Sequence, residues 1–441
     1  MLGTGYEPFR LVTYSHDGYG LGHLRRTSNI AARFVEDALG STALMLTGCP
    51  VGNVFPLPEG VDFIKVPSLI KVDTGVYDPL GLRIGRQKAK AIRASTILSA
   101  VTQFKPHLFL VDHVPAGIKG ELLATLRMLR GLDNPPVIVL GLRDIIDAPS
   151  VVCELWRKEM TYQTIRKYYD EVFIYGCKDT FDAALHYRIN AELPGRVRYC
   201  GYVCSEGPVK SSEQVREELR LRRRKLVVVT TGGGHDGYPL MQSCMEAFRL
   251  VGRVPPFEAV FITGPLMDPA QREQLRAQAR GLGVRVITSV EDPPSFINAA
   301  DLVITMGGYN SLCEVVSLRK KALVVPRLGP RAEQRMRARL FQEKGLIDAL
   351  DPREASAKSL AERVMVDLER KDFPSATATI DTAGSIAAAG RLLELAVGRL
   401  ALRRLPLSSA ADTGMGRANP RPPQWSAIKP GVRPASGSWR A

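Results

Sequence analysis

The chain has 441 residues, more than one hydrophobic core comfortably serves, so we expect two domains of about 200 residues each. Its 45% hydrophobic and 24% charged residues are typical of globular proteins, and no apolar run reaches the ~18 residues that span a bilayer. The net charge of +15 is compatible with anionic lipid, anionic substrates or nucleic acid as partners. Nucleic acid is the least favoured, because no recognition motif or interleaved aromatic residues accompany the charge.

The seven cysteines are scattered and form no CxxC pair, which predicts reduced thiols in a cytoplasmic protein and no structural zinc. The first residues lack a basic region followed by an apolar one, so we expect no secretory signal. Pro, Arg, Ser and Gly dominate beyond about residue 405, which predicts a disordered tail over 405–441. This basic tail and the basic helices would suit peripheral contact with the anionic inner face of a membrane.

Short apolar runs alternate with amphipathic stretches through the first half of the chain. We expect strands at residues 9–14, 44–46, 63–66, 108–111, 137–140 and 172–175, and helices at 24–39, 86–104 and 151–169. This βαβ periodicity predicts a mostly parallel sheet with helices on both faces. Residues 71–85 lack periodicity and are rich in Gly, Pro and Asp, which predicts a long functional loop.

The second half repeats the pattern after a polar, then basic stretch. We expect an N-terminal domain over 1–203, a linker over 204–224 and a C-terminal domain over 225–404. Strands are predicted at 226–230, 259–263, 284–288, 302–305 and 322–325, and a helix after residue 383 closes the folded part. The fold class predicted is therefore α/β, with two doubly wound domains.

The first strand leads into the glycine-rich sequence SHDGYGLGH, which ends at His23 near a helix N-terminus. The helix dipole disfavours a protonated imidazole there, which suits a neutral general base. His16 and Asp17 share the loop, and either could be the base or orient it. The alternative for His23 is that it caps the turn or packs against the next strand.

A second glycine-rich turn, TGGGHDG, follows the strand at 226–230. Gly232, Gly233 and Gly234, followed by His235, would make a phosphate cradle at a helix N-terminus, or a structural turn. A nicotinamide dinucleotide is not favoured, because Thr263 and Gly264 stand where its acidic residue is expected.

The most informative stretch is 301–334, DLVITMGGYNSLCEVVSLRKKALVVPRLGPRAEQ. Gly307 and Gly308 break a buried strand, and Asn310 or Ser311 would cap the helix that carries Glu314. A second strand ends at Pro326 and a further helix follows. Two strand ends thus converge on one sheet edge, where open α/β sheets bind ligands and where Glu314 and Gln334 could read hydroxyl groups.

Charged residues also follow two strands of the first half: Asp112 with His113, and Arg143 with Asp144. They would line the cleft as acceptor-site candidates, or serve as helix caps and salt bridges. No cluster of metal ligands is visible in the sequence, so we expect no metal and no cofactor.

GxGH after the first strand, TGGG at mid-chain and TMGGYNSLCEVVSLRKKALVVPR…EQ together resemble the GT-B glycosyltransferases, which have two Rossmann-like domains facing a cleft. The MurG-like group, which contains the UDP-N-acetylglucosamine transferase of peptidoglycan synthesis, is similar over residues 9–400. The segment YCGYV at 199–203 resembles that group's interdomain hinge. VDHVPAGIKGEL and LGLRDIID are most similar to uncharacterised predicted bacterial glycosyltransferases.

The resemblance implies transfer of a hexose or N-acetylhexosamine from a nucleotide-sugar, most simply a UDP-sugar, to an acceptor hydroxyl, with inversion and without metal. Glu314 would bind the ribose, and Glu333 and Gln334 the donor sugar. His23 would lie near the reacting centre. The diphosphate would be held by Gly232, Gly233 and Gly234 and by the backbone around Gly308, Asn310 and Ser311. Gly22, His235 and Gly307 would complete the nucleotide-sugar site.

The acceptor stays open, and a lipid-linked one is an option. The run RAEQ differs from the acidic-Arg-Gln-Gln run of the MurG enzyme, so the donor sugar also stays open. The same fold supports nucleotide-sugar hydrolases, in which the histidine activates water, and epimerases. A catalytically silent nucleotide-sugar-binding protein is the alternative outside enzymes.

Overall fold

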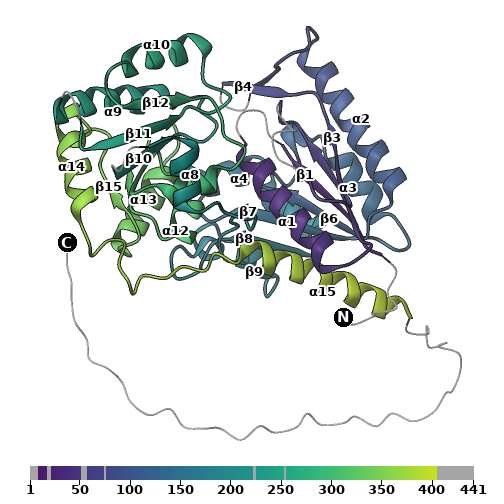
Figure 1. The fold of residues 1–441 in the computed structure, drawn as a ribbon. Coiled ribbons are helices and arrows are strands. Elements are labelled where there is room, and N and C mark those ends of the chain that lie inside the picture. The colour runs from purple at the N-terminus through teal and green to yellow at the C-terminus, as the bar shows by residue number, and fades with distance from the viewer. Residues whose placement is uncertain are drawn as a thin grey trace, which may run out of the picture.

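The computed structural model describes residues 8–16, 21–50, 57–73, 76–221, 225–252 and 255–404. Two α/β halves lie side by side, each built around a parallel sheet (Figure 1). Asp17 and the tail predicted at 405–441 lie outside the described residues. Within the described ranges, no helix is both long and apolar enough to cross a membrane.

The N-terminal sheet has seven parallel strands in the order β3-β2-β1-β6-β7-β8-β9. Their bounds are β1 (Arg10–Ser15), β2 (Thr42–Thr47), β3 (Val61–Lys65), β6 (Leu108–Asp112), β7 (Val137–Arg143), β8 (Glu171–Tyr175) and β9 (Val197–Tyr199). β6 and β8 are buried along their whole length, as expected for strands covered on both faces. The strand order reverses between β1 and β6, and the last residues of these strands, Ser15 and Asp112, are paired.

The C-terminal sheet has six parallel strands in the order β12-β11-β10-β13-β14-β15. These are β10 (Lys225–Thr230), β11 (Phe257–Ile262), β12 (Val284–Ile287), β13 (Leu302–Thr305), β14 (Ala322–Val324) and β15 (Asp348–Ala349). Here the order reverses between β10 and β13, whose ends are paired at Thr230 and Thr305. Ligands of open α/β sheets bind where the strand order reverses. Each domain has one such reversal point, and both face the space between the two domains.

Helices cover both sheets. In the N-terminal half they are α1 (Gly22–Asp37), α2 (Arg86–Phe104), α3 (Leu123–Arg130), α4 (Pro149–Lys158), α5 (Thr161–Tyr168), α6 (Ala183–His186) and α7 (Ile189–Glu192), with a 3₁₀ turn at Ile118–Gly120. The rest are α8 (Ser212–Glu218), α9 (Tyr238–Val251), α10 (Pro269–Ala279), α11 (Pro293–Ala299), α12 (Tyr309–Ser317), α13 (Glu333–Glu343), α14 (Ala357–Glu369) and α15 (Gly384–Arg404). Helical spacing of buried apolar residues, such as Ile30, Ala31 and Phe34 in α1, explains how they dock on the sheets.

Local details differ from the sequence prediction in three places. The helix predicted at 151–169 is two helices, broken at Met160, whose φ of 52° is left-handed. The loop predicted at 71–85 begins as an antiparallel hairpin, β4 (Leu69–Asp73) with β5 (Val76–Pro79). α12 begins at Tyr309 with Gly308 as its N-cap and no side-chain cap, so neither Asn310 nor Ser311 caps it.

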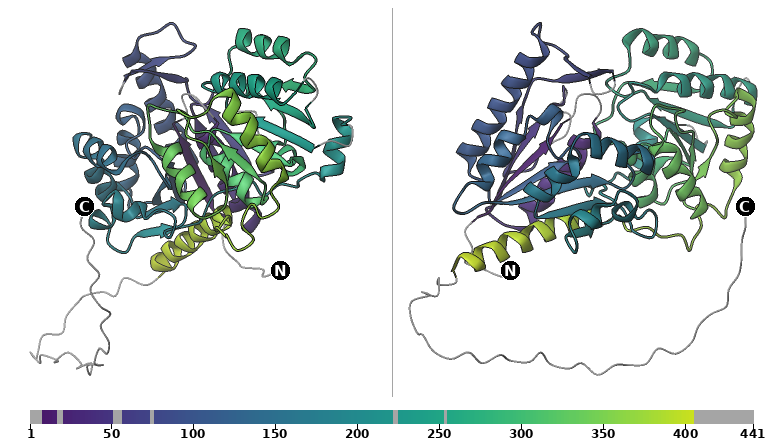
Figure 2. Two further views of the ribbon diagram at one scale, coloured as in Figure 1. Left: turned by 90° about the vertical axis from the view of Figure 1, so that its left-hand side faces the viewer. Right: turned by 180° about the vertical axis from the view of Figure 1, so that it is seen from behind.

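The end of the described chain returns to the N-terminal domain. α15, the yellow-green helix of Figures 1 and 2, packs against α1, and Arg391 forms an ion pair with Glu171 at 2.8 Å. Residues 384–404 therefore lie with the N-terminal domain, unlike the predicted boundary at 404. The chain passes between the domains twice, near Tyr202 and again at residues 381–384. These two segments lie side by side, because Tyr202 N–H donates to Asp381 O at 2.8 Å and Gly384 N–H to Tyr202 O at 3.0 Å. α8, in the predicted linker, packs against α11.

Candidate functional site

A cavity of about 340 Å³ lies between the domains, at the carboxyl ends of both sheets. Eleven of the predicted site residues line it: Gly22, His23, Arg143, Gly232, Gly233, Gly308, Asn310, Ser311, Glu314, Glu333 and Gln334. The other predicted residues that the structure describes are not part of its lining: His16, Asp112, His113, Asp144, Gly234, His235 and Gly307. The cavity thus brings Gly22 and His23 of the N-terminal domain opposite Gly232 and Gly233 of the C-terminal domain.

His23 lies in the first turn of α1 and contacts Asp112, the last residue of β6. Its Nδ1 lies 2.5 Å from Asp112 Oδ2 and 2.9 Å from Arg26 Nη2. Because the carboxylate can only accept, the shorter contact assigns the proton to Nδ1 and leaves Nε2 as a proton acceptor. Burial lowers the pKa of His23 well below 6.5, and the neighbouring His16 and Arg26 add to this. His23 is therefore a neutral imidazole oriented by a carboxylate, the arrangement of a general base.

Arg26 holds the carboxylate of Asp112. It donates to Oδ1 at 3.0 Å through Nε and to Oδ2 at 2.7 Å through Nη2, and its side chain is 1% exposed. The guanidinium also lies 5.4 Å and 5.2 Å from the ring centres of Tyr175 and Tyr309. This pairing supplies the counter-charge that a fully buried carboxylate requires. Asp112 therefore orients His23 and does not itself face the cavity.

Two further histidines surround His23. The ring centres of His16 and His113 lie 4.4 Å and 5.0 Å from that of His23. Burial lowers the pKa of His16 to about 4 and that of His113 well below 6.5, so the group is uncharged at neutral pH. Nδ1 of both residues is buried without a hydrogen-bond partner, and His113 has a left-handed backbone with φ of 70°.

The glycine-rich turns at β10 and β13 require glycine for close approach. A Cβ on Gly234, where φ is 91°, would lie 2.0 Å from Thr263 O, and one on Gly307, where φ is 77°, would lie 2.9 Å from Val324 Cγ1. These two residues are packed against the protein, while Gly232 and Gly233 line the cavity beside the N-terminus of α12. Free backbone N–H groups at such a terminus favour an anion. His235 is exposed and lies away from the cavity.

Glu314, the predicted ribose ligand, is engaged by the other domain. Its Oε1 lies 2.6 Å from Nη1 of Arg25 on α1, and the two side chains are 6% and 16% exposed. Burial raises the pKa of the Glu314 carboxyl, and the Arg25 charge opposes that rise. Asn310 also reaches α1, donating from Nδ2 to Gly22 O at 3.3 Å.

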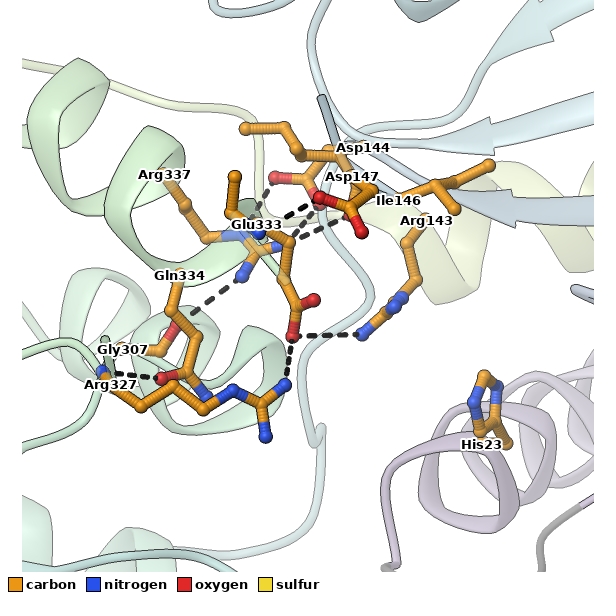
Figure 3. A network of polar contacts seen from close by, with 12 residues as sticks. His23, Arg143, Asp144, Ile146, Asp147, Gly307, Arg327, Glu333, Gln334 and Arg337 are labelled. Atoms are coloured by element: carbon orange, nitrogen blue, oxygen red, sulfur yellow. Dashed lines mark hydrogen bonds and ion pairs between the residues drawn. The ribbon is translucent and has the colours of Figure 1, made fainter. Parts of the chain in front are cut away.

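At the opposite end of the cavity, Glu333 and Gln334 begin α13. Figure 3 shows Arg327 and Arg143 converging on Glu333 Oε1, at 3.0 Å and 4.0 Å, while Gln334 accepts from Arg327 N–H at 3.1 Å. Glu333 Oε2 is buried without a hydrogen-bond partner, as are Nε and Nη2 of Arg143. This end of the cavity therefore holds both acceptors and donors for a polar substrate group.

Asp144, predicted either to line the cleft or to form a helix cap or salt bridge, forms a salt bridge. It accepts from Arg337 of α13 at 2.9 Å and 2.7 Å, and each side chain of this interdomain pair is 1% exposed. Tyr202 donates to the same carboxylate at 3.2 Å. Asp144 is thus a structural contact between the domains, whereas its neighbour Arg143 faces the cavity.

Sequence reasoning missed several residues that line the cavity, among them Arg25, Arg26, Asp236 and Arg327, and it also missed the interdomain contact of Arg337, which does not line it. Arg25 and Arg26 directly follow His23 in GHLRR, and the (i, i+3) spacing puts Arg26 on the same face of α1 as His23. That spacing was a usable signal. Arg337 offered none, since its partner lies in the other domain. Among the described residues, no group of three or more His, Cys, Asp or Glu side chains could hold a metal ion.

Comparison with known proteins finds similarity to glycosyltransferases. Residues 226–389 match the model of the glycosyltransferase family 28 C-terminal domain. The UDP-N-acetylglucosamine–N-acetylmuramyl-(pentapeptide) pyrophosphoryl-undecaprenol N-acetylglucosamine transferase of Rubrobacter xylanophilus is 34% identical over 153 residues, which cover 34% of this chain and 43% of that enzyme. The chain thus spans less than half the length of the curated relatives it matches.

Solved structures cover nearly the whole chain at low identity. Acinetobacter baumannii MurG has a TM-score of 0.54 at 12% identity, covering 89% of this chain and 100% of that one. A putative UDP-N-acetylglucosamine 2-epimerase from Listeria monocytogenes has a TM-score of 0.59 at 16% identity, covering 91% and 99%. These likenesses establish the fold. Residues 226–389 are therefore similar to the glycosyltransferase family 28 C-terminal domain, and the chain as a whole has the GT-B fold that the sequence resemblance predicted.

Proposed function

We propose that this protein is a glycosyltransferase that moves a sugar from a nucleotide-sugar to a hydroxyl group of an acceptor. One observation carries the proposal: the neutral His23, oriented by Asp112, faces the glycine-rich turns of the C-terminal domain across a single cavity. A base on one side and an anion-binding helix N-terminus on the other are what displacement of a nucleoside diphosphate requires.

In the proposed reaction, Nε2 of His23 takes the proton from the acceptor hydroxyl while Nδ1–H stays bonded to Asp112. The acceptor oxygen forms a bond to the anomeric carbon as the bond from that carbon to the diphosphate oxygen breaks. Arg26 donates to both oxygens of Asp112, and this carboxylate faces the imidazolium that forms. A single displacement of this kind inverts the configuration at the anomeric carbon.

The donor would occupy the C-terminal side of the cavity. Glu314 would accept from the ribose hydroxyls, the N–H groups at the start of α12 and at Gly232 and Gly233 would hold the diphosphate, and Glu333 with Gln334 would bind the sugar. Several of the matched relatives are named as UDP-N-acetylglucosamine transferases, which supports a UDP-sugar carrying a hexose or N-acetylhexosamine.

We further propose a lipid-linked acceptor, in keeping with the pyrophosphoryl-undecaprenol acceptor in the names of those relatives. The surface around β5 and the start of α2 suits peripheral contact with an anionic membrane, on its cytoplasmic face. Leu80 and Leu82 are 40% and 46% exposed there, next to the exposed Arg83, whereas Arg86 is paired with Asp78. Apolar side chains beside a cation are what such contact uses.

The test is a panel of UDP-, dTDP- and GDP-sugars with a mixture of lipid-linked and soluble acceptors, using wild type and His23→Ala. We expect release of one nucleoside diphosphate that depends on acceptor, and a loss of about 10²- to 10⁴-fold in His23→Ala with unchanged nucleotide binding. Release of free sugar without acceptor would indicate a hydrolase, and a changed sugar on an intact nucleotide an epimerase. Binding without any turnover would indicate a silent binding protein.

A further inference from the structure

Arg25 and Glu314 form an ion pair that joins the two domains in the wall of the cavity between them. Arg25 lies in the first turns of α1 and Glu314 in α12, and their closest atoms, Nη1 and Oε1, are 2.6 Å apart. Both residues line the cavity. The contact is therefore part of the nucleotide site and not of the solvated rim.

The surroundings of Glu314 make its charge depend on Arg25. The residue is 5% exposed. α1 and α11 pack against α12, α1 contributing Arg25 and α11 preceded by its N-cap Asp292. Burial raises the pKa of the Glu314 carboxyl, the Arg25 guanidinium lowers it, and the Asp292 carboxylate raises it again. Arg25 therefore opposes burial and Asp292 in part, since the pKa of Glu314 remains raised.

The ionisation of Glu314 matters for what it can bind. A carboxylate accepts hydrogen bonds at both oxygens, whereas a protonated carboxyl group loses part of this capacity and becomes a donor. A pair of ribose hydroxyls donates two hydrogen bonds and so requires the ionised form. Since Arg25 occupies Oε1 from outside the donor domain, it fixes the carboxylate without closing the cavity.

We infer that Arg25 is a positioning residue of the nucleotide site: it holds the Glu314 carboxyl group in place from the other domain, so that the ribose site is complete only while the two domains are apposed. This inference rests on the proposed function. It makes nucleotide affinity sensitive to domain closure through one side chain of the N-terminal domain.

The experiment measures affinity of the full chain for UDP, dTDP, GDP and ADP by titration calorimetry between pH 5.5 and 8. Arg25→Gln should lose about tenfold in affinity at pH 7, the size of one hydrogen bond to a charged group. The loss should grow as the pH falls, because the freed Glu314 carboxyl takes up a proton. Arg25→Lys should restore most of the affinity. Arg339→Gln removes an equivalent but exposed pair with Glu343 and should change nothing.

Three results would overturn the inference. Equal affinity of wild type and Arg25→Gln at every pH, with a loss in Glu314→Gln, would remove Arg25 from the site and leave the proposed function standing. Tighter binding by Arg25→Gln would show that Arg25 obstructs the nucleotide. Failure of wild type to bind any of the four nucleotides would overturn the proposed function itself. Circular dichroism checks that each variant is folded. If Arg25→Gln does not fold, the comparison of Arg25→Lys with wild type still tests the inference.

Discussion

Replacing Asp144 by Asn measures what the buried ion pair between the domains contributes to stability. Arg337 donates to both carboxylate oxygens, at 2.9 Å and 2.7 Å, and both side chains are 1% exposed. Two unit charges about 4 Å apart at an effective dielectric constant of about 20 attract each other by about 4 kcal/mol. Removing one charge leaves the other buried and unpaired, so we expect the free energy of unfolding to fall by about 3 to 5 kcal/mol.

Urea unfolding followed by circular dichroism measures the free energy of unfolding. A double-mutant cycle then isolates the interaction energy between Asp144 and Arg337. Arg337→Gln should cost a similar amount, and the double variant should cost at least ~2 kcal/mol less than the sum, because no buried charge remains. The control is Asp179→Asn. Asp179 pairs with Lys344 across the same domains at 2.8 Å, but is 73% exposed, so we expect a cost below ~1 kcal/mol.

Either of two outcomes would refute this reasoning. A cost below ~1 kcal/mol for Asp144→Asn would mean that water reaches Arg337 once the carboxylate is gone. Additive single costs would mean that the two residues act through separate contacts, such as the hydrogen bond from Tyr202 to Asp144.

Three further predictions concern pH and metal. Because burial lowers the pKa of His23 below 6.5, the acidic limb of a pH profile of kcat/KM should lie below pH 6.5, and a limb at or above that value would contradict a neutral base. Burial, reinforced by Asp348, raises the pKa of Asp367 from 3.8 to about 7, so its contribution to stability is present below pH ~4 and lost as the pH rises through 7. Asp367→Asn should therefore raise the free energy of unfolding at pH 8 and flatten its pH dependence, as measured by urea unfolding at pH 4 to 8. Sugar transfer should continue in EDTA, since backbone N–H groups are expected to stabilise the diphosphate; loss of turnover restored by Mg²⁺ would contradict this.

The periodicity of the chain predicted the fold well, because buried strands and amphipathic helices carry local signals. α2 spans Arg86–Phe104 as predicted, and each glycine-rich turn follows the strand expected. The hairpin of β4 and β5 was missed, since neither strand is a buried apolar run. The break at Met160 was missed because a left-handed residue other than glycine leaves no signature in the sequence.

The site could be predicted only in part, for a geometric reason. Strand-end positions placed His23 and Asp112 in one cleft, but their hydrogen bond depends on β1 and β6 being neighbours, across 89 residues of sequence. Contacts between the domains, such as Arg25 with Glu314, were beyond reach because no local pattern reports how two separate sheets face each other.

The return of α15 to the N-terminal domain makes the C-terminal domain an insertion, in topological terms, within the fold of the first. α15 packs against α1, so the first and the last helices described complete one core. During synthesis, the whole C-terminal domain must be translated before α15 is made and the hydrophobic core of the N-terminal domain can be completed. The apolar side chains of α1, among them Ile30 and Phe34, then await a partner made some 350 residues later, at the ~5–20 residues per second of translation. The N-terminal half is thus the first to be made and the last to be finished.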